Sequence, residues 1–566
     1  MHLRAALLIV FAAAAGRASA QYGPDPPDTP PAFKCAWRKL AAKYAHVNRP
    51  DADAKVYDAL QLGQYCGSAE YPRPDEAALP TVFPPREGGP SAPPPAGVFA
   101  DADRGSDDTG TGTAAAPFAT IQKAVDAAAT KPADERRVIL RNGTFHPAAT
   151  VQIPHGAHGL SIEGMAGEEA WVSGGTKLDP IDWKPHNLSG GMNIWKADLS
   201  RFKLSEVPGL RVNGRRVTPA RYPNADPETS FWPTGYMTSS GSRPCAGFNV
   251  SCGTREPCTA GCGATWKAPK IAPKPNPATV VNVTDPLHSR EWDNQFTHYA
   301  GGIGGTCSIY SPPFSFWCSS APFSAGCGGC FTWNIPSGID FPSSMLQKYD
   351  KAKLVSNGHI VAWRAAHWAN WHFEIGDYES SSGVDPESKE ALSSITFGKG
   401  GFQGARGGIG SDWYISNVFE ELDTKTEYYY DIKQATLFYF SNATKQGEKP
   451  KEAFVATTLH TLFNVTGASQ DTPLTGFTLK GVGLRDTAPT MLEPHGVPSG
   501  GDWALERIGS VFLQNTEHAT LTGLSFTRIG GNGVMVSAYN RHTVVEQSEF
   551  AWMGGSAIAA WSVSPP

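Results

Sequence analysis

Short apolar segments separated by glycine, asparagine and threonine recur along the last third of the chain. Residues 520–526 match residues 543–550 at an offset of 23 to 24 residues, and residues 533–536 match residues 556–559 at 23. A repeat of this length, with two or three short strands and turns between them, is typical of one coil of a parallel β-helix. The pattern therefore predicts stacked coils, the earliest of them starting at 477–482.

Two interruptions of these coils are also visible in the sequence. Residues 488–502 are rich in glycine and proline and predict a long loop that leaves the first of these coils. Asn532-Gly533 predicts a left-handed turn between two strands.

An earlier segment, 117–164, begins with a helical pattern and continues with strands. Pro117 suits the first position of a helix, and the apolar side of that helix holds Phe118, Ile121, Ala124, Val125 and Ala128. Strands are expected at 138–140 and 160–164, with a turn at 142–145. Because no further helix separates the strands, the pattern favours a solenoid over a βαβ sheet, and the helix would cover its open apolar end.

This segment resembles the start of the pectate-lyase-like β-helix superfamily, whose members open with G-x-D…GT…PF-x-T-I-x-x-A and then L-x-x-G-x-Y. Gly105 and Asp107 precede the matching residues 117–124, and Phe145 stands where the superfamily has tyrosine. The resemblance implies a right-handed parallel β-helix that begins near residue 97 and is capped by a helix over 118–128. It is specific for the fold and says little about the chemistry.

Two further segments, 210–224 and 417–439, resemble paired elements of β-helix glycoside hydrolases. The first reads L-R-V-N-G-R-R with A-R-Y-P-N, and the second reads N-V-F-E-E-L-D with E-Y-Y-Y-D and L-F-Y. Thr424-Lys425-Thr426 alters the turn of the second element, and Tyr428 replaces the usual tryptophan. Together the resemblances cover most of 97–566 and imply a carbohydrate-active protein without selecting one activity.

The first 20 residues predict export. Arg4 lies in a short basic start, residues 5–15 are apolar, and Ala18-Ser19-Ala20 offers the small residues of a signal-peptide cleavage site. This apolar run is shorter than the ~20 residues that span a bilayer. We therefore expect a secreted product without a membrane span.

Cysteines and glycosylation sequons agree with a secreted protein. The chain has 10 cysteines, an even number that suits pairing in an oxidising compartment. Six asparagines stand in N-x-S/T sequons and are candidate glycan acceptors: Asn142, Asn187, Asn249, Asn282, Asn442 and Asn464.

The chain divides into four expected segments after cleavage, namely a helical hairpin at 32–66, a proline-rich linker at 67–96, the β-helix domain at 97–566 and, within it, a cysteine-rich insert at 243–335. Cys35 and Cys66 flank the α-hairpin, and a disulfide between them would join its two ends. Eight cysteines lie in the insert, and their pairing stays open. Structural disulfides are favoured there over a zinc or redox site. The chain stops directly after a strand, so we expect the β-helix to be C-terminally incomplete.

Charge and composition exclude some partners. The formal net charge is −5 and no basic stripe is present, which makes nucleic acid an unfavourable partner. No acidic cluster has Ca²⁺ spacing, and we expect neither a metal nor a cofactor. We expect a monomer that acts on a polysaccharide or another glycan.

The loop 492–507 carries the candidate catalytic carboxyls. Glycoside hydrolysis needs one protonated and one ionised carboxyl group, and Glu493, Asp502 and Glu506 are the candidates. Carboxylates on neighbouring coils would lie about 4.8 Å apart along the axis. The alternative is that Asp502 caps a turn while Glu506 is solvated.

Candidate substrate-binding residues are aromatic or basic: Trp503, His495 and Arg507 in the same loop, and Trp368 in an aromatic cluster with Trp363, His367, Trp371 and His372. Stacking of sugar faces on tryptophan is one interpretation of the cluster, and buried packing is the other. A metal pair at His367 and His372 is disfavoured by their spacing. Arg507, Arg528 and Arg541 lie about one coil apart or less and would suit an anionic sugar.

Three functions remain open. A secreted glycoside hydrolase leads, and a polysaccharide lyase that acts on an anionic glycan is second. The third is a non-catalytic matrix or surface protein that binds glycans along the solenoid face.

Overall fold

The computed structural model describes Arg38, residues 96–222, Asn224, short strands between 237 and 257, and 338–561 except 345–348, 365–369, 385–388, 390, 401–408, 494 and 497–504. The chain divides into two compact units, 1–78 with 227–233 and 79–226 with 234–566. Everything described below lies in the second unit. The hairpin at 32–66 (Arg38 apart), the linker and all ten cysteines lie outside the described residues.

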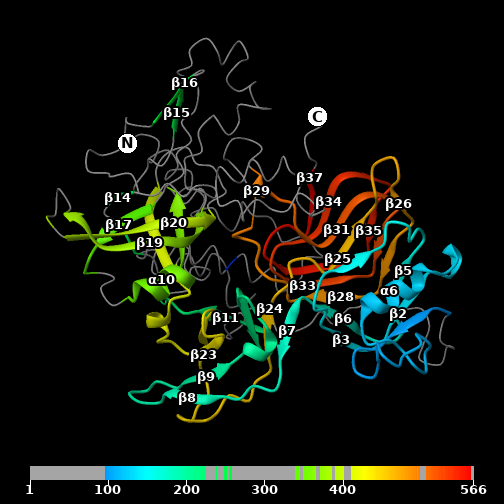
Figure 1. Cartoon of the computed structure of the whole chain (residues 1–566), viewed down its shortest axis with the longest axis horizontal. Helices are drawn as coiled ribbons and strands as arrows, with labels where there is room; N and C mark the ends of the chain where they lie inside the picture. Colours follow the sequence, from blue (N-terminus) through cyan, green and yellow to red (C-terminus); the bar gives the residue numbers. More distant parts are fainter. Residues whose placement is uncertain are drawn as a thin grey trace. The chain divides into compact units, whose positions relative to one another are not determined.

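Three parallel sheets, here called A, B and C, form the main body of this unit (Figure 1). Sheet A contains β1 (Val98–Ala100), β2 (Arg137–Leu140), β5 (Ser161–Gly164), β27 (Thr478–Lys480), β32 (Thr520–Thr522) and β35 (Val544–Glu546). Sheet B contains β3 (Gly143–Phe145), β6 (Ala170–Ser173), β28 (Gly483–Arg485), β33 (Ser525–Ile529) and β36 (Glu549–Met553). Sheet C contains β4 (Val151–Ile153), β25 (Phe463–Thr466), β31 (Gly509–Glu517), β34 (Asn532–Arg541) and β37 (Ile558–Trp561), with β26 (Leu474–Thr475) beside β31.

The chain visits the sheets in the order A, B, C and then returns to A, so each circuit adds one strand to every sheet. Inward side chains of successive circuits stack in columns, as Leu479 and Leu521 do in sheet A. In sheet B the rings of Phe526 and Phe550 stack at 4.4 Å. Burying each such side chain contributes roughly 1.5–3 kcal/mol, so the columns form a continuous apolar core. The described part is mostly β with parallel sheets, which confirms the all-β class.

The repeat has the predicted length, but its register differs by one residue. Thr520 pairs with Val544 and Val534 with Ile558, each 24 residues later in the chain. A one-residue shift moves every side chain to the other face of the sheet. Val545 accordingly packs against the core, whereas Val544 is 42% exposed.

The helix at the first circuit, α6 (Ile121–Ala129), begins three residues later than the sequence predicted. The Asp107 carboxylate accepts hydrogen bonds from the backbone N–H groups of Ala119 and Thr120, at 2.8 and 3.0 Å, and the Thr120 side chain caps Lys123 N–H. These contacts fix the helix start after Phe118, which instead bridges to Ala100. The segment expected as a turn at 142–145 contains a strand, β3, which pairs with β6. Asn532 likewise lies in strand β34 and not in a left-handed turn.

Between β6 and β25 the chain leaves the three parallel sheets. One eight-stranded sheet, here called D, contains β7 (Gly175–Leu178), β24 (Phe454–Thr457), β10 (Gly209–Val212), β11 (Arg215–Pro219), β22 (Glu427–Asp431), β23 (Thr436–Phe440), β9 (Ile194–Asp198) and β8 (Lys184–Asn187). Another, called E, contains β12 (Arg221–Tyr222), β21 (Ile409–Ser416), β18 (His359–Arg364), β19 (Asn370–Val384), β20 (Ala391–Gly400), β17 (Gly338–Pro342), β14 (Gly241–Ser242) and β13 (Met237–Thr238). Helix α10 (Lys351–Asn357) precedes β18, and β15 (Phe248–Ser251) pairs with β16 (Thr254–Pro257). These mainly antiparallel strands add no circuits, so the interruption extends well beyond 243–335.

The two segments that resemble glycoside hydrolases meet at Glu427. Its carboxylate accepts hydrogen bonds from the backbone N–H groups of Arg221, Asp423 and Thr424, at 3.3, 3.2 and 3.1 Å. Burial raises the pKa of Glu427 to about 8. A carboxyl group enclosed by three backbone donors joins a turn to the strand beside it, so we assign Glu427 a structural role.

None of the helices in the described part of the chain is long and apolar enough to cross a membrane.

Candidate functional site

The loop after β28 brings two of the three predicted carboxyl groups into one electrostatic environment. Glu493 follows the turn at Thr490, to whose carbonyl oxygen its N–H donates at 2.9 Å. Glu506 ends β30 (Leu505–Glu506), which pairs with β29 (His495–Gly496). Asp502 and Trp503 lie outside the described residues, as do Trp368 and the side chain of His495, so their roles stay predictions.

Glu506 is buried against the turn between β33 and β34. A Cβ atom added at Gly531 would lie 2.8 Å from Glu506 Oε1 and 2.5 Å from Thr490 Oγ1, so the carboxyl group packs directly on the glycine. Burial raises the pKa of Glu506 to about 7, and the negative charge of Glu493 acts in the same direction. Hydrogen bonds from the Thr490 side chain and the Asn532 backbone oppose that rise. Glu506 can therefore hold a proton near neutral pH, as a general acid must.

Glu493 has the opposite environment. Its Oε1 lies 3.1 Å from Lys399 Nζ, and the two side chains are 24% and 37% exposed. A cation at this distance favours the ionised carboxylate. Two carboxyl groups whose surroundings favour different protonation states are a known indicator of acid and base assignments.

Sheet E supplies further charged groups around Lys399. His359 of β18 lies opposite Glu374 of β19 in the antiparallel register. Burial raises the pKa of Glu374, while Lys399 opposes this and the charge of Glu493 adds to it. Burial lowers the pKa of His359 to about 4, with Lys399 acting in the same direction. Burial also lowers the pKa of His460, which precedes β25.

The sequence analysis missed these groups because they are distant in the chain. Lys399 lies 94 residues before Glu493. Neither Lys399 nor Glu374 belongs to a motif, and only the folding of the inserted strands brings them to the loop.

Arg507, predicted to bind substrate, is an interior residue. It is 1% exposed, its Nε donates to Ser537 Oγ at 2.9 Å, and an NH2 group donates to Gln514 Oε1 at 2.6 Å. A guanidinium enclosed in this way links two circuits and cannot reach a glycan, so the prediction for Arg507 is wrong. The suggested arginine row also fails, because Arg528 is buried in an ion pair with Asp486 at 2.6 Å.

The sequons differ in accessibility. Asn142 and Asn442 are exposed and Asn187 is half-buried, whereas Asn282 and the side chain of Asn249 lie outside the described residues. Asn464 is 4% exposed, and its amide donates to Gln152 Oε1 at 2.7 Å. This burial argues against a glycan on Asn464 and corrects that prediction.

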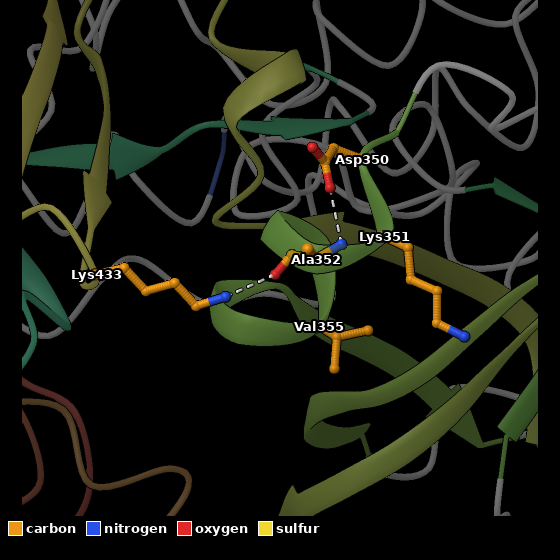
Figure 2. Close-up of a pocket in the computed structure, with 5 residues that line it drawn as sticks. All are labelled: Asp350, Lys351, Ala352, Val355 and Lys433. Carbon is orange, nitrogen blue, oxygen red and sulfur yellow. Dashed lines mark hydrogen bonds between the residues drawn. The ribbon is translucent and has the colours of Figure 1, made fainter.

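A hollow of about 610 Å³ lies elsewhere, beside α10 (Figure 2). It is lined by Asp350, Lys351, Ala352, Val355 and Lys433, of which Asp350 caps the helix and Lys433 Nζ donates to the Ala352 carbonyl oxygen at 3.5 Å. None of the candidate catalytic residues lines it. Among the described residues, no group of three or more His, Cys, Asp or Glu side chains is arranged to hold a metal.

Comparisons with known proteins leave the family open. No protein-family model matches the chain, and no curated protein matches its sequence. Among solved structures, a protein titled "Glycoside hydrolase" is similar at 14% identity and a TM-score of 0.48, over 80% of this chain and 65% of that one. A structure titled "The complex structure of XylC with xylose" is similar at 10% identity and a TM-score of 0.25, over 78% of this chain and 42% of that one. The chain thus spans 65% of the length of the first of these proteins, and neither likeness places it in a family.

Proposed function

We propose that the protein is a secreted, carbohydrate-active enzyme that hydrolyses glycosidic bonds of a polysaccharide on a right-handed parallel β-helix. The observation that carries the proposal is the pair Glu506 and Glu493, two carboxyl groups of one loop in opposite environments. Loops that project from a rigid scaffold commonly hold catalytic residues.

Glu506 acts as the general acid in this proposal. Its proton passes to the glycosidic oxygen as the bond between that oxygen and the anomeric carbon breaks. Glu493 is the ionised partner, and either attacks the anomeric carbon or takes a proton from the water that attacks it. In both cases one water is consumed and a new reducing end is released.

The test is the release of reducing ends from a panel of neutral and acidic polysaccharides. Glu506→Gln and Glu493→Gln keep the shape of the side chains but remove their acid–base chemistry, and each should lower kcat by about 10²–10⁴-fold. Glu448→Gln, which changes a surface carboxyl paired with Lys451 at 3.0 Å, is the matched control and should retain activity.

Two outcomes would contradict the assignment. Full activity of both Glu506→Gln and Glu493→Gln would remove the pair from the reaction. Loss of activity in Glu374→Gln together with normal activity in Glu506→Gln would transfer the acid role to Glu374. If the products instead show the ultraviolet absorbance of an unsaturated uronate, the enzyme is a lyase. Binding of a glycan without any product would favour the matrix-protein alternative.

Export and glycosylation belong to the same proposal. Mass spectrometry of the protein secreted by a eukaryotic host should give a mature N-terminus at Gln21. Retention of residues 1–20 would contradict the signal peptide.

A further inference from the structure

Lys399 links the inserted sheet E to the catalytic loop. It stands one residue before the end of β20, and its Nζ lies 3.1 Å from Glu493 Oε1. Both side chains are partly exposed, so by itself this ion pair would resemble many surface pairs that contribute little.

The backbone around the pair is closely packed, which distinguishes it from an ordinary surface pair. A Cβ atom added at Gly400, whose φ is +118°, would lie 2.0 Å from the His372 carbonyl oxygen and 3.1 Å from Leu492 Cδ2. Leu492 directly precedes Glu493, and Gly400 directly follows Lys399. The two charged residues therefore project from chain segments that already touch, and little side-chain entropy is needed to hold them together.

Lys399 is also the cation that faces the other ionisable groups of the site. Its charge acts on Glu374 of β19, on His359 of β18 and on His460 before β25. Glu206, before β10, is a further carboxylate that acts on Glu374 and His460. Without Lys399, several carboxyl groups would repel one another, and Glu493 would be the exposed group closest to the lost charge.

We infer that Lys399 is a positioning residue, whose ammonium group holds the Glu493 carboxylate ionised and in one place near Glu506. The inference rests on the proposed function. It assigns to the inserted sheet a part in the reaction, although the proton donor and its partner both belong to the loop between circuits. The charge held on Glu493 in turn disfavours ionisation of Glu506.

The experiment compares kcat/KM against pH for the full chain, on the polysaccharide of the panel that it cleaves fastest. In Lys399→Met, the acid limb of the profile should move to higher pH by about half to one pH unit, and kcat should fall by about tenfold. Lys399→Arg keeps the cation and should restore most of the activity. Lys351→Met removes another lysine of an ion pair, 2.7 Å from Asp377 of β19, and is the control that should change neither quantity.

The outcomes separate this inference from the proposed function. An unshifted acid limb in Lys399→Met, with Glu493→Gln inactive, would overturn the role of Lys399 alone. Activity of Glu493→Gln, or no cleavage of any glycan by the wild type, would overturn the proposed function and the inference with it. A purely structural role for Lys399 would lower the yield or Tm of Lys399→Met while leaving the pH profile in place.

Discussion

Ionisation of Glu506 should make the folded protein less stable as the pH rises, and Glu506→Gln should remove this effect. The carboxyl group is buried, and its pKa rises from 4.5 to about 7 on folding. Between these two values the unfolded chain has lost the proton while the folded chain still holds it. Stability therefore falls with rising pH across this window, and it is unaffected by Glu506 below the window.

The magnitude follows from the size of the pKa change. A pKa difference of one corresponds to 1.36 kcal/mol, so the printed values for Glu506 correspond to roughly 3 kcal/mol of stability lost between about pH 4.5 and pH 7. Glutamine keeps the volume of the side chain and cannot ionise. The stability of Glu506→Gln relative to the wild type should accordingly increase by about 3 kcal/mol over the same window.

The assay is guanidinium denaturation of both proteins at several pH values from 4.5 to 8, with Glu448→Gln as a surface control. The expected result is a wild-type midpoint that falls with pH relative to that of Glu506→Gln, and a constant difference for the control. If the difference between Glu506→Gln and the wild type is the same at every pH, then Glu506 does not bind its proton more tightly in the folded state. The argument for its role as an acid would then be refuted.

Three further predictions concern the packing of the site, the first circuit and the sequons. Gly531→Ala should displace the Glu506 carboxyl group, since its Cβ would lie 2.8 Å from Oε1, and should lower kcat with a loss of about 1–3 kcal/mol in stability. Asp107→Ala removes the carboxylate that accepts from two backbone N–H groups at the start of α6 and should lower the free energy of unfolding by about 1–2 kcal/mol; an unchanged Tm would contradict this capping role. In a glycosylating host, Asn442→Gln should remove the mass of one glycan, whereas Asn464→Gln should leave the glycan mass unchanged.

The circuits could be predicted from sequence because their physical cause is repetitive. Each circuit must place apolar side chains over those of the previous one, as Phe526 and Phe550 do, and this requirement leaves a periodic pattern. The register was wrong by one residue because glycine and threonine occur on both faces and do not fix which residue points inward. In the structure, the pairing of Thr520 with Val544 is set by the core position of Val545.

The start of α6 and the inserted sheets were harder to predict, for different reasons. The helix begins where the distant Asp107 carboxylate binds backbone N–H groups, and apolar periodicity carries no record of that contact. Sheets D and E consist of antiparallel strands with long separations in sequence, such as β12 with β21. Pairings of that kind depend on the whole fold and leave no local repeat.

The candidate site divides along the same line. Glu493 and Glu506 were found because a loop of glycine and proline that leaves a regular repeat is visible in the sequence alone. Arg507 was misassigned because a basic side chain next to such a loop can point inward as well as outward, and Ser537 and Gln514 of neighbouring strands accept its hydrogen bonds. Residue type predicts the chemistry a group can perform, whereas its direction is set by strand register.

The position of the insertion explains why the site needs both parts of the described unit. Circuits alone present repeated, nearly equivalent surfaces, and a carboxylate on one of them has no built-in source of asymmetry. The strands between β6 and β25 bring Lys399 to within 3.1 Å of Glu493 while leaving Glu506 enclosed by Gly531 and Thr490 of the circuits. One carboxyl group thus gains a cation and the other loses water, and this difference is the physical requirement for an acid and an ionised partner to coexist near neutral pH.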